Sequence, residues 1–226
     1  MWNKKFLLLL ACFGCVINIC FAAPKEKPKA EWDSIAFHGA YLGVDLVSAG
    51  QIALGQNGKI NLQVDVNLYN RLNPCLELGY ASFDISKQNE TRSFGQGFYT
   101  KVGLNLPISK YGPHAENQFF AGLRYAYSRF NYQLENVQFG ASYWEDAYCV
   151  DLLNQRAGGH WLEIDVGMRT NVWGPISLGW TLTLKRRLAV NNASASAPAF
   201  IPAYGPNRES NQAFSFSLYY LLPFKR

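Results

Sequence analysis

The chain has 226 residues, which is enough for one domain, and a formal net charge of +5 at pH 7. Charged residues make up only 16% of it, against about 25% in soluble domains, whereas aromatic residues reach 15%. The mild positive charge argues against a nucleic-acid-binding protein. The low content of charged residues indicates that part of the protein surface is not exposed to water.

The N-terminal segment has the features of a secretory signal peptide. Two lysines precede an apolar run over residues 6–21, which is short for a transmembrane helix, and two alanines then supply small residues for cleavage. We expect cleavage after Ala22, so that residues 1–22 are the signal peptide and residues 23–38 a periplasmic leader rich in Pro, Lys and Glu. The alternative is a lipoprotein acylated at Cys12, Cys15 or Cys20.

From residue 39 onward the dominant pattern is strict alternation of apolar and polar residues, which is the period of a β-strand. It is clearest over residues 60–69, where Ile, Leu and Val alternate with Asn, Gln and Asp. The same alternation recurs over residues 41–46, 76–81, 100–106, 119–128, 162–169, 176–185 and 214–220. After the signal peptide, no apolar stretch of 18 residues remains, which excludes a helical membrane protein. Residues 39–226 therefore form one barrel domain of eight strands.

The predicted connections differ in length in a regular way. Those over residues 70–74 and 173–175 are tight turns, and the one over residues 107–117 is compact. The other four are longer and cover residues 49–59, 85–97, 131–159 and 190–211. Short turns at one end and long loops at the other are typical of bacterial outer-membrane proteins. The fold class is all-β: an eight-stranded antiparallel up-and-down transmembrane β-barrel with short periplasmic turns and long extracellular loops.

The polar face of the strands carries glycines and balanced charges, which suits the crowded interior of a small barrel in lipid. A soluble lipocalin-like barrel, with its apolar face inside, is the alternative. The predicted interior polar network, with a structural role, consists of Asp45, Asp65, Glu77, Lys101, Arg124, Glu163, Asp165, Arg169, Lys185 and Arg187. Aromatic residues near strand ends are candidates for interfacial girdles: Tyr80, Tyr125, Tyr127, Trp173, Phe214 and Tyr220.

Several segments resemble a family of uncharacterised small outer-membrane β-barrel proteins of Bacteroidota. The matching segments cover the mature chain in order: Tyr41-Leu42-Gly43-Val44-Asp45-Leu46, Leu76-Glu77-Leu78-Gly79-Tyr80, Phe120-Ala121-Gly122-Leu123-Arg124-Tyr125, His160-Trp161-Leu162-Glu163, Leu178-Gly179-Trp180 with Lys185 and Arg187, and Ile201-Pro202. The resemblance implies an outer-membrane barrel and no particular chemistry.

We expect no enzymatic activity, no cofactor and no metal site. Three scattered His and two distant Cys lack the spacing of zinc ligands. A lipid-modifying enzyme is the alternative, and it would need a base within reach of a nucleophile. His160 is the histidine nearest the extracellular rim, but its position in the alternation places it on the lipid side, whereas the neighbouring Ser128 points inward.

Function is therefore expected in the loops of a structural, interaction or ligand-binding barrel. The loop over residues 131–159 offers the candidate binding residues Tyr143, Trp144, Asp146 and Tyr148 for an unidentified extracellular ligand. Expected partners are outer-membrane lipid and, during biogenesis, periplasmic chaperones and the barrel-assembly machinery, with export through the Sec pathway of a Gram-negative bacterium. Cys75 and Cys149 are predicted to be free thiols, because they lie at opposite ends of the barrel.

Overall fold

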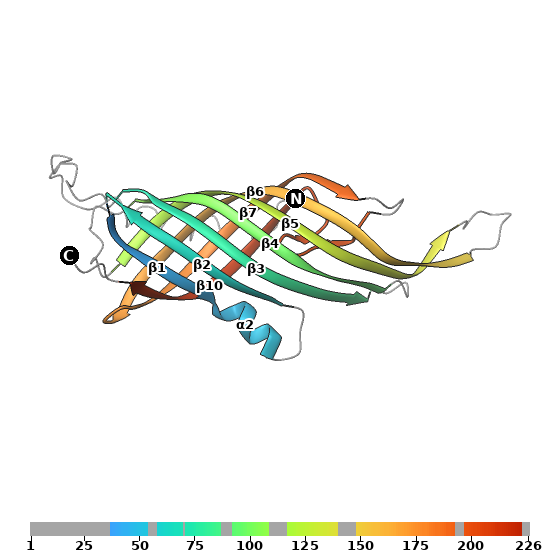
Figure 1. Ribbon diagram of the computed structural model, residues 1–226, viewed down its shortest axis with the longest axis horizontal. Helices are drawn as coiled ribbons and strands as arrows, with labels where there is room; N and C mark the ends of the chain where they lie inside the picture. The colour runs from blue at the N-terminus through green and yellow to red at the C-terminus, as the bar shows by residue number, and fades with distance from the viewer. Residues whose placement is uncertain are drawn as a thin grey trace, which may run out of the picture. The chain divides into compact units, whose positions relative to one another are not determined.

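The barrel is closed and built from eight long strands (Figure 1). The computed structural model describes residues 37–53, 58–69, 71–86, 92–108, 117–139, 148–192 and 197–222; the predicted signal peptide and most of the leader lie outside these ranges. The strands are β1 (Phe37–Asp45), β2 (Lys59–Leu68), β3 (Asn73–Ser86), β4 (Arg92–Pro107), β5 (Asn117–Phe139), β6 (Tyr148–Trp173), β7 (Ile176–Asn192) and β10 (Ser210–Leu222).

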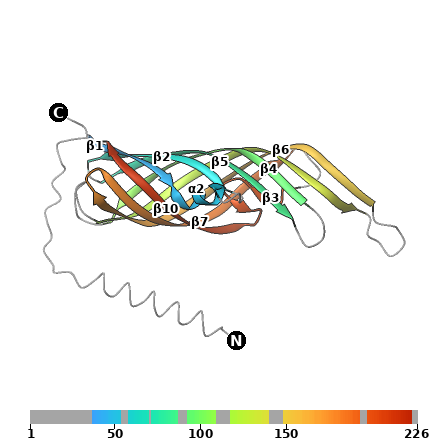
Figure 2. The same cartoon turned by 90° about the horizontal axis from the view of Figure 1, so that it is seen from below.

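The strands pair in the order β1-β10-β7-β6-β5-β4-β3-β2, and every pairing is antiparallel. This is the up-and-down barrel that the alternation predicts, with each of the eight predicted strands in its place. Seen from below, the strands run obliquely around the barrel (Figure 2), as closure of a sheet requires. At one end, β6 passes into β7 through a tight turn in which Gly174 adopts φ +53°.

Apolar side chains point out of this barrel and polar side chains point in. On β4, Phe98 is 71% exposed while its neighbour Tyr99 is 2% exposed, and on β2, Ile60 is 63% exposed while Asp65 is 1% exposed. A barrel surrounded by water has the opposite arrangement, because water favours polar side chains outside. The lipid-facing orientation of a transmembrane barrel accounts for the pattern, whereas a lipocalin-like barrel does not.

Two strands extend far beyond the rest. β5 has 23 residues and β6 has 26, so the predicted loop over residues 131–159 is wrong in its flanks: residues 131–139 and 148–159 continue the β5–β6 hairpin. The pairing shifts register between Tyr132 and Leu134 and again before Val137, and Asn136 adopts φ 58°. Such bulges break the alternation locally, which is why the sequence pattern does not extend through this region.

The connection after β1 contains a short helix, α2 (Leu46–Ala53), where the sequence predicted one more strand residue and then a loop. Asp45 ends the strand and caps the helix: its Oδ1 accepts the backbone N–H of Val47 at 3.1 Å, and its Oδ2 accepts the Ser48 hydroxyl at 2.8 Å. A side-chain oxygen at this position satisfies helix N–H groups that lack partners. No helix in the described ranges is long and apolar enough to cross a bilayer.

Part of the predicted loop over residues 190–211, residues 197–209, folds into the mouth of the barrel, whereas residues 190–192 continue β7 and residues 210 and 211 begin β10. It contains the two-residue strands β8 (Phe200–Ile201) and β9 (Gly205–Pro206). Ile201 and Tyr204 are almost fully buried and pack in one cluster with inward side chains of β3, β5 and β6: Phe83, Phe130, Tyr132, Leu134 and Trp161. We call residues 197–209, whose Ile201 and Tyr204 belong to this apolar cluster, the plug; it lies above the polar interior of the barrel.

Candidate functional site

The barrel interior is the most elaborate polar site among the described residues. Arg124 lies at its centre on β5 and reaches carboxylates of two other strands. Its Nη1 lies 3.4 Å from Oε2 of Glu77, and its Nε lies 2.8 Å from Oδ2 of Asp165. All three side chains are at most 6% exposed. Because an unpaired buried charge is strongly destabilising, these groups stabilise one another only as a set.

Lys101 connects this centre to the next carboxylate. Its Nζ lies 3.3 Å from Glu77 and 3.2 Å from Oε2 of Glu163. Glu163 is fully buried and also accepts the indole N–H of Trp161 at 2.8 Å. Lys185 lies farther from Glu163, at 3.9 Å, and donates to the backbone carbonyl groups of the plug at Ala203 and Tyr204. The interior network therefore holds the plug as well as the barrel wall.

The end of the interior near the tight turns has its own ion pair. Arg169 is paired with Asp65 across the barrel, and its guanidinium lies 4.1 Å from the ring centroid of Tyr41 and 4.0 Å from that of Tyr219. Stacking between two aromatic rings fixes the guanidinium plane and adds cation–π attraction. This packing fills the cross-section near the turns that join β6 to β7 and β2 to β3.

Nine of the ten predicted network residues are buried inside the barrel: Asp45, Asp65, Glu77, Lys101, Arg124, Glu163, Asp165, Arg169 and Lys185. Arg187 differs. In the β6–β7 pairing, Arg187 lies opposite Trp161 and Ala189 lies opposite His160, so Leu188 forms a bulge in β7. The Arg187 side chain donates a hydrogen bond to Oδ1 of Asn207 in the plug loop. A residue that the sequence placed in a loop replaces it: Lys59 lies 3.2 Å from Asp45. The balance of five cations and five carboxylates is kept.

The network has two neutral members that were not predicted from the sequence. Tyr99 donates its hydroxyl to Oε1 of Glu77 at 3.1 Å, and Trp161 donates to Glu163. Their inward position in the strand alternation is the signal that identifies them, because an inward Tyr or Trp needs a partner for its polar atom.

The space left inside is small. A void of about 30 Å³ lies among Asp45, Asn61, Glu77, Lys101 and Thr181, which is room for about one water molecule. Above it, a cleft of about 240 Å³ opens between α2 and the plug and is lined by Ser48, Lys59, Lys185, Tyr204 and Asn211.

The residues of the alternative catalytic pair lie on opposite sides of the wall. Ser128 is fully buried and donates to the backbone carbonyl of Phe98 at 3.2 Å. His160 contacts the exposed Tyr125 hydroxyl through Nδ1 at 3.1 Å on the outer face. In this geometry the imidazole does not reach the Ser128 hydroxyl, so the pair cannot act as base and nucleophile. Within the described ranges no group of three or more His, Cys, Asp or Glu side chains is arranged to hold a metal ion.

The predicted loop-binding residues are only partly placed by the structure. Tyr143, Trp144 and Asp146 lie outside the described residues, and Tyr148 begins β6 without a described side chain. Cys75 and Cys149 are both free thiols, as predicted; Cys75 is buried and Cys149 is exposed. In the strand register, Cys149 lies opposite Gln138 near the tip of the β5–β6 hairpin, whereas Cys75 is the third residue of β3, at the other end of the barrel.

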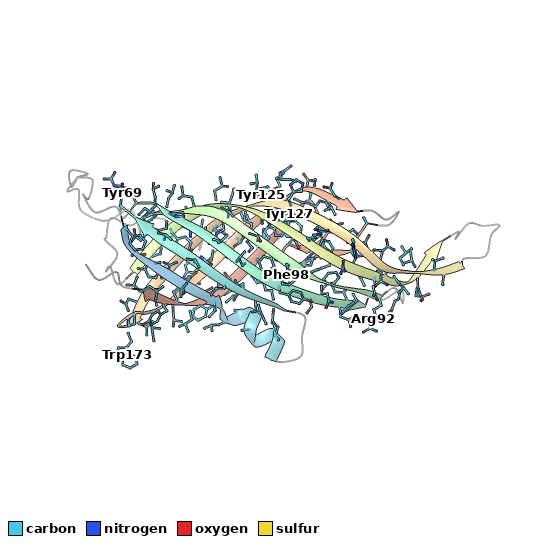
Figure 3. All side chains as sticks on the ribbon, in the orientation of Figure 1. Tyr69, Arg92, Phe98, Tyr125, Tyr127 and Trp173 are labelled. Carbon is cyan, nitrogen blue, oxygen red and sulfur yellow. The ribbon has the colours of Figure 1, made fainter. Side chains whose placement is uncertain are left out.

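Exposed aromatic side chains mark two levels along the outer face. Figure 3 shows Tyr69 and Trp173 at one end of the barrel and, farther along it, the group of Phe98, Tyr125 and Tyr127. All five are more than a third exposed. Beyond the second group, the outward side chains of β5 become polar, with Arg129 and Asn131 both exposed. Aromatic side chains that combine a ring with a polar atom favour the boundary between lipid and water.

The height of the apolar band can be taken from β4. Ile108 follows Phe98 by ten residues (108 − 98), and the outward positions between them are apolar or Thr. At about 3.3 Å per residue and a strand tilt of about 40°, this distance corresponds to roughly 25 Å along the barrel axis. That value equals the apolar band of an outer-membrane barrel.

Comparisons with known proteins give a family and two distant structures. A family model described as "Domain of unknown function (DUF6048)" matches residues 5–226. No curated protein matches the sequence. The solved structures include Ail, the attachment invasion locus protein of Yersinia pestis, in complex with the heparin analogue sucrose octasulfate (8% identity, 81% of this chain and 94% of that chain, TM-score 0.39). They also include a major outer membrane protein from Thermus thermophilus (12% identity, 83% of this chain and 99% of that chain, TM-score 0.45).

Proposed function

The chain belongs to the family described as Domain of unknown function (DUF6048) and folds as a barrel of the outer-membrane type, and from this we propose that it is a closed, non-enzymatic outer-membrane barrel. Its membrane-spanning part is an anchor filled by ion pairs. Its extended extracellular end, capped by the plug, is the part that meets partners or ligands. The observation that carries this proposal is the exposed apolar band of about 25 Å on the outer face of a barrel with a polar interior.

The alternative functions fit the structure less well. A lipid-modifying enzyme needs a nucleophile and a base on the same side of the wall, and Ser128 and His160 lie on opposite sides. A soluble lipocalin-like barrel needs an apolar interior, and the interior below the plug holds five ion-paired carboxylates. Hydrolysis of a lipid ester by the purified barrel would support the first alternative, and recovery in the soluble periplasm would support the second.

The route to the membrane is part of the proposal. We infer a signal peptide over residues 1–22, export through the Sec pathway, and insertion with the help of periplasmic chaperones and the barrel-assembly machinery of a Gram-negative bacterium. A source among the Bacteroidota follows from the sequence resemblance alone. The positive and apolar N-terminal residues support the export step.

Cys149 provides a direct test of location and orientation. In intact cells, a membrane-impermeant maleimide is expected to modify Cys149, which is exposed near the tip of the extracellular hairpin, and not Cys75, which is buried near the periplasmic turns. The labelled protein should fractionate with outer membranes and migrate differently on a detergent gel before and after heating. Cys149→Ser is the control, because it removes the reactive thiol and leaves Cys75. Labelling of only Cys75, or recovery in the soluble periplasm, would contradict the proposal.

The closed interior predicts the electrical behaviour of the barrel. In planar bilayers the purified protein is expected to give no stepwise ion conductance, because side chains fill the interior and the described cavity within it is about 30 Å³. Insertion is verified by the heat-modifiable migration of protein recovered from the same lipid. Regular conductance steps from correctly inserted protein would show a pore that the packed interior does not allow.

A further inference from the structure

A groove of about 570 Å³ lies on the outer face of the barrel, over strands whose inner face carries the network residues Arg124, Glu163 and Lys185. Its floor is one row of paired residues across four strands: Leu123, Ile164, Leu184 and Gln212. The three aliphatic side chains in this row are 55–57% exposed. The next row toward the extracellular end brings Leu162, Arg186 and Ser210 side by side. The groove is therefore apolar below and cationic above.

Arg186 has a guanidinium that is available to a ligand. Its Nη2 lies 2.7 Å from Oε1 of Glu209, but both side chains are 73% exposed. An ion pair this open to water contributes little and is easily exchanged for a better partner. A phosphate offers such a partner, because its oxygens accept two parallel N–H bonds from one guanidinium.

Arg208 is the second cation at the upper edge. Within the described part of the chain, its guanidinium has neither an ion pair nor a hydrogen bond, while its backbone is fixed. The backbone N–H donates to Pro206 O at 2.7 Å, and the backbone carbonyl accepts the hydroxyl of the buried Tyr204 at 2.8 Å. Tyr204 packs in turn on Trp161, with ring centroids 5.3 Å apart. The plug therefore presents, from a backbone held by hydrogen bonds, an arginine whose side chain has no partner among the described residues.

We propose that this groove binds a phosphate-bearing lipid of the surrounding membrane, with its phosphate on Arg186 and Arg208 and its acyl chains along Leu123, Ile164 and Leu184. The proposal rests on the membrane location given above. The groove lies where the apolar band meets the polar extension, which is the level of a lipid headgroup. A water-soluble anion would use the arginines and leave the aliphatic floor exposed, so the combination of both favours a lipid.

The test uses the purified full barrel in detergent micelles and native mass spectrometry. The probes are dioleoyl phosphatidic acid and dioleoylglycerol, which carry the same acyl chains and differ in the phosphate. We expect phosphatidic acid to be retained and dioleoylglycerol to be lost. In the double variant Arg186→Gln, Arg208→Gln, phosphatidic acid should bind about tenfold more weakly or worse, as removal of charge-assisted hydrogen bonds implies. Ile164→Ser should also weaken retention, through the acyl chains.

Arg92→Gln is the matched control. Arg92 is also an exposed arginine paired with an exposed carboxylate, Asp84, but it lies on another part of the outer face. This variant should bind phosphatidic acid as the unmodified barrel does, and heat-modifiable migration shows that each variant is folded. Equal retention of the two probes, equal loss in Arg92→Gln, or full competition by glycerol 3-phosphate would each overturn the proposal. None of these outcomes affects the fractionation test, so the lipid site can fail while the membrane location stands.

Discussion

Replacing Arg124 by Leu should lower the free energy of unfolding by about 3–5 kcal/mol, as breaking a buried ion pair does. Arg124 is the only described cation that contacts both Glu77 and Asp165. Its loss leaves Asp165 with the Thr183 hydroxyl as its remaining hydrogen-bond donor. Equilibrium unfolding in urea, followed by tryptophan fluorescence of the barrel in lipid vesicles, measures the change.

Arg92→Leu is the control for this prediction, because Arg92 and Asp84 form their ion pair on the outer face of the extension. Hydrogen bonding to Arg92 holds the pKa of the Asp84 carboxyl below its usual value, yet water screens the pair and little stability depends on it. Asp165→Asn added to Arg124→Leu should recover part of the loss, since it removes the stranded charge. A loss below about 0.5 kcal/mol for Arg124→Leu would place Arg124 at a solvated surface.

Replacing Gly79 by Ala should destabilise the barrel by about 1–3 kcal/mol, the usual range for overpacking. A Cβ on Gly79 would lie 2.4 Å from Cζ of Tyr99 and 2.6 Å from the backbone oxygen of Ile60. The ring can move only by leaving Glu77, to which its hydroxyl donates. The same urea unfolding assay measures the effect.

Gly50→Ala is the control for this prediction, because the same substitution there should not lower the stability. Gly50 lies in α2, and a Cβ there meets no atom within 4 Å. Alanine is favoured over glycine in a helix by up to about 1 kcal/mol, so this variant should be neutral or slightly more stable. Equal effects of the two substitutions would show that the Gly79–Tyr99 contact does not limit packing of the interior.

The barrel wall could be predicted from the sequence because its physical basis is local. Each strand separates a lipid face from a packed polar face, so the period of two appears in every segment, as at residues 60–69. The pairing of Glu77, Arg124 and Asp165 follows the same pattern, since inward charges in a narrow barrel must meet one another. The partner of each charge could not be assigned, because partners come from strands far apart in the sequence.

The regions that could not be predicted share another property. In the β5–β6 extension, bulges and Asn136 interrupt the alternation. In the plug, the burial of Ile201 depends on tertiary contact with the mouth, which no periodicity records. The exchange of Arg187 for Lys59 in the interior has the same origin, because a bulge at Leu188 and the plug loop together redirect one side chain.

Because the plug fills one end of the barrel, a single β-sheet is stabilised in lipid along one part of its length and in water along the other. Between Ile108 and Phe98, the outward apolar side chains face lipid, and the stability of this part depends on bilayer thickness and composition. Beyond that level, Phe83, Phe130 and Tyr132 face inward, so this part carries a hydrophobic core like that of a water-soluble protein and responds to urea, salts and osmolytes in the usual way. β5 passes through both environments without interruption. A change of bilayer should therefore act on one half of the molecule, and a change of aqueous cosolute on the other.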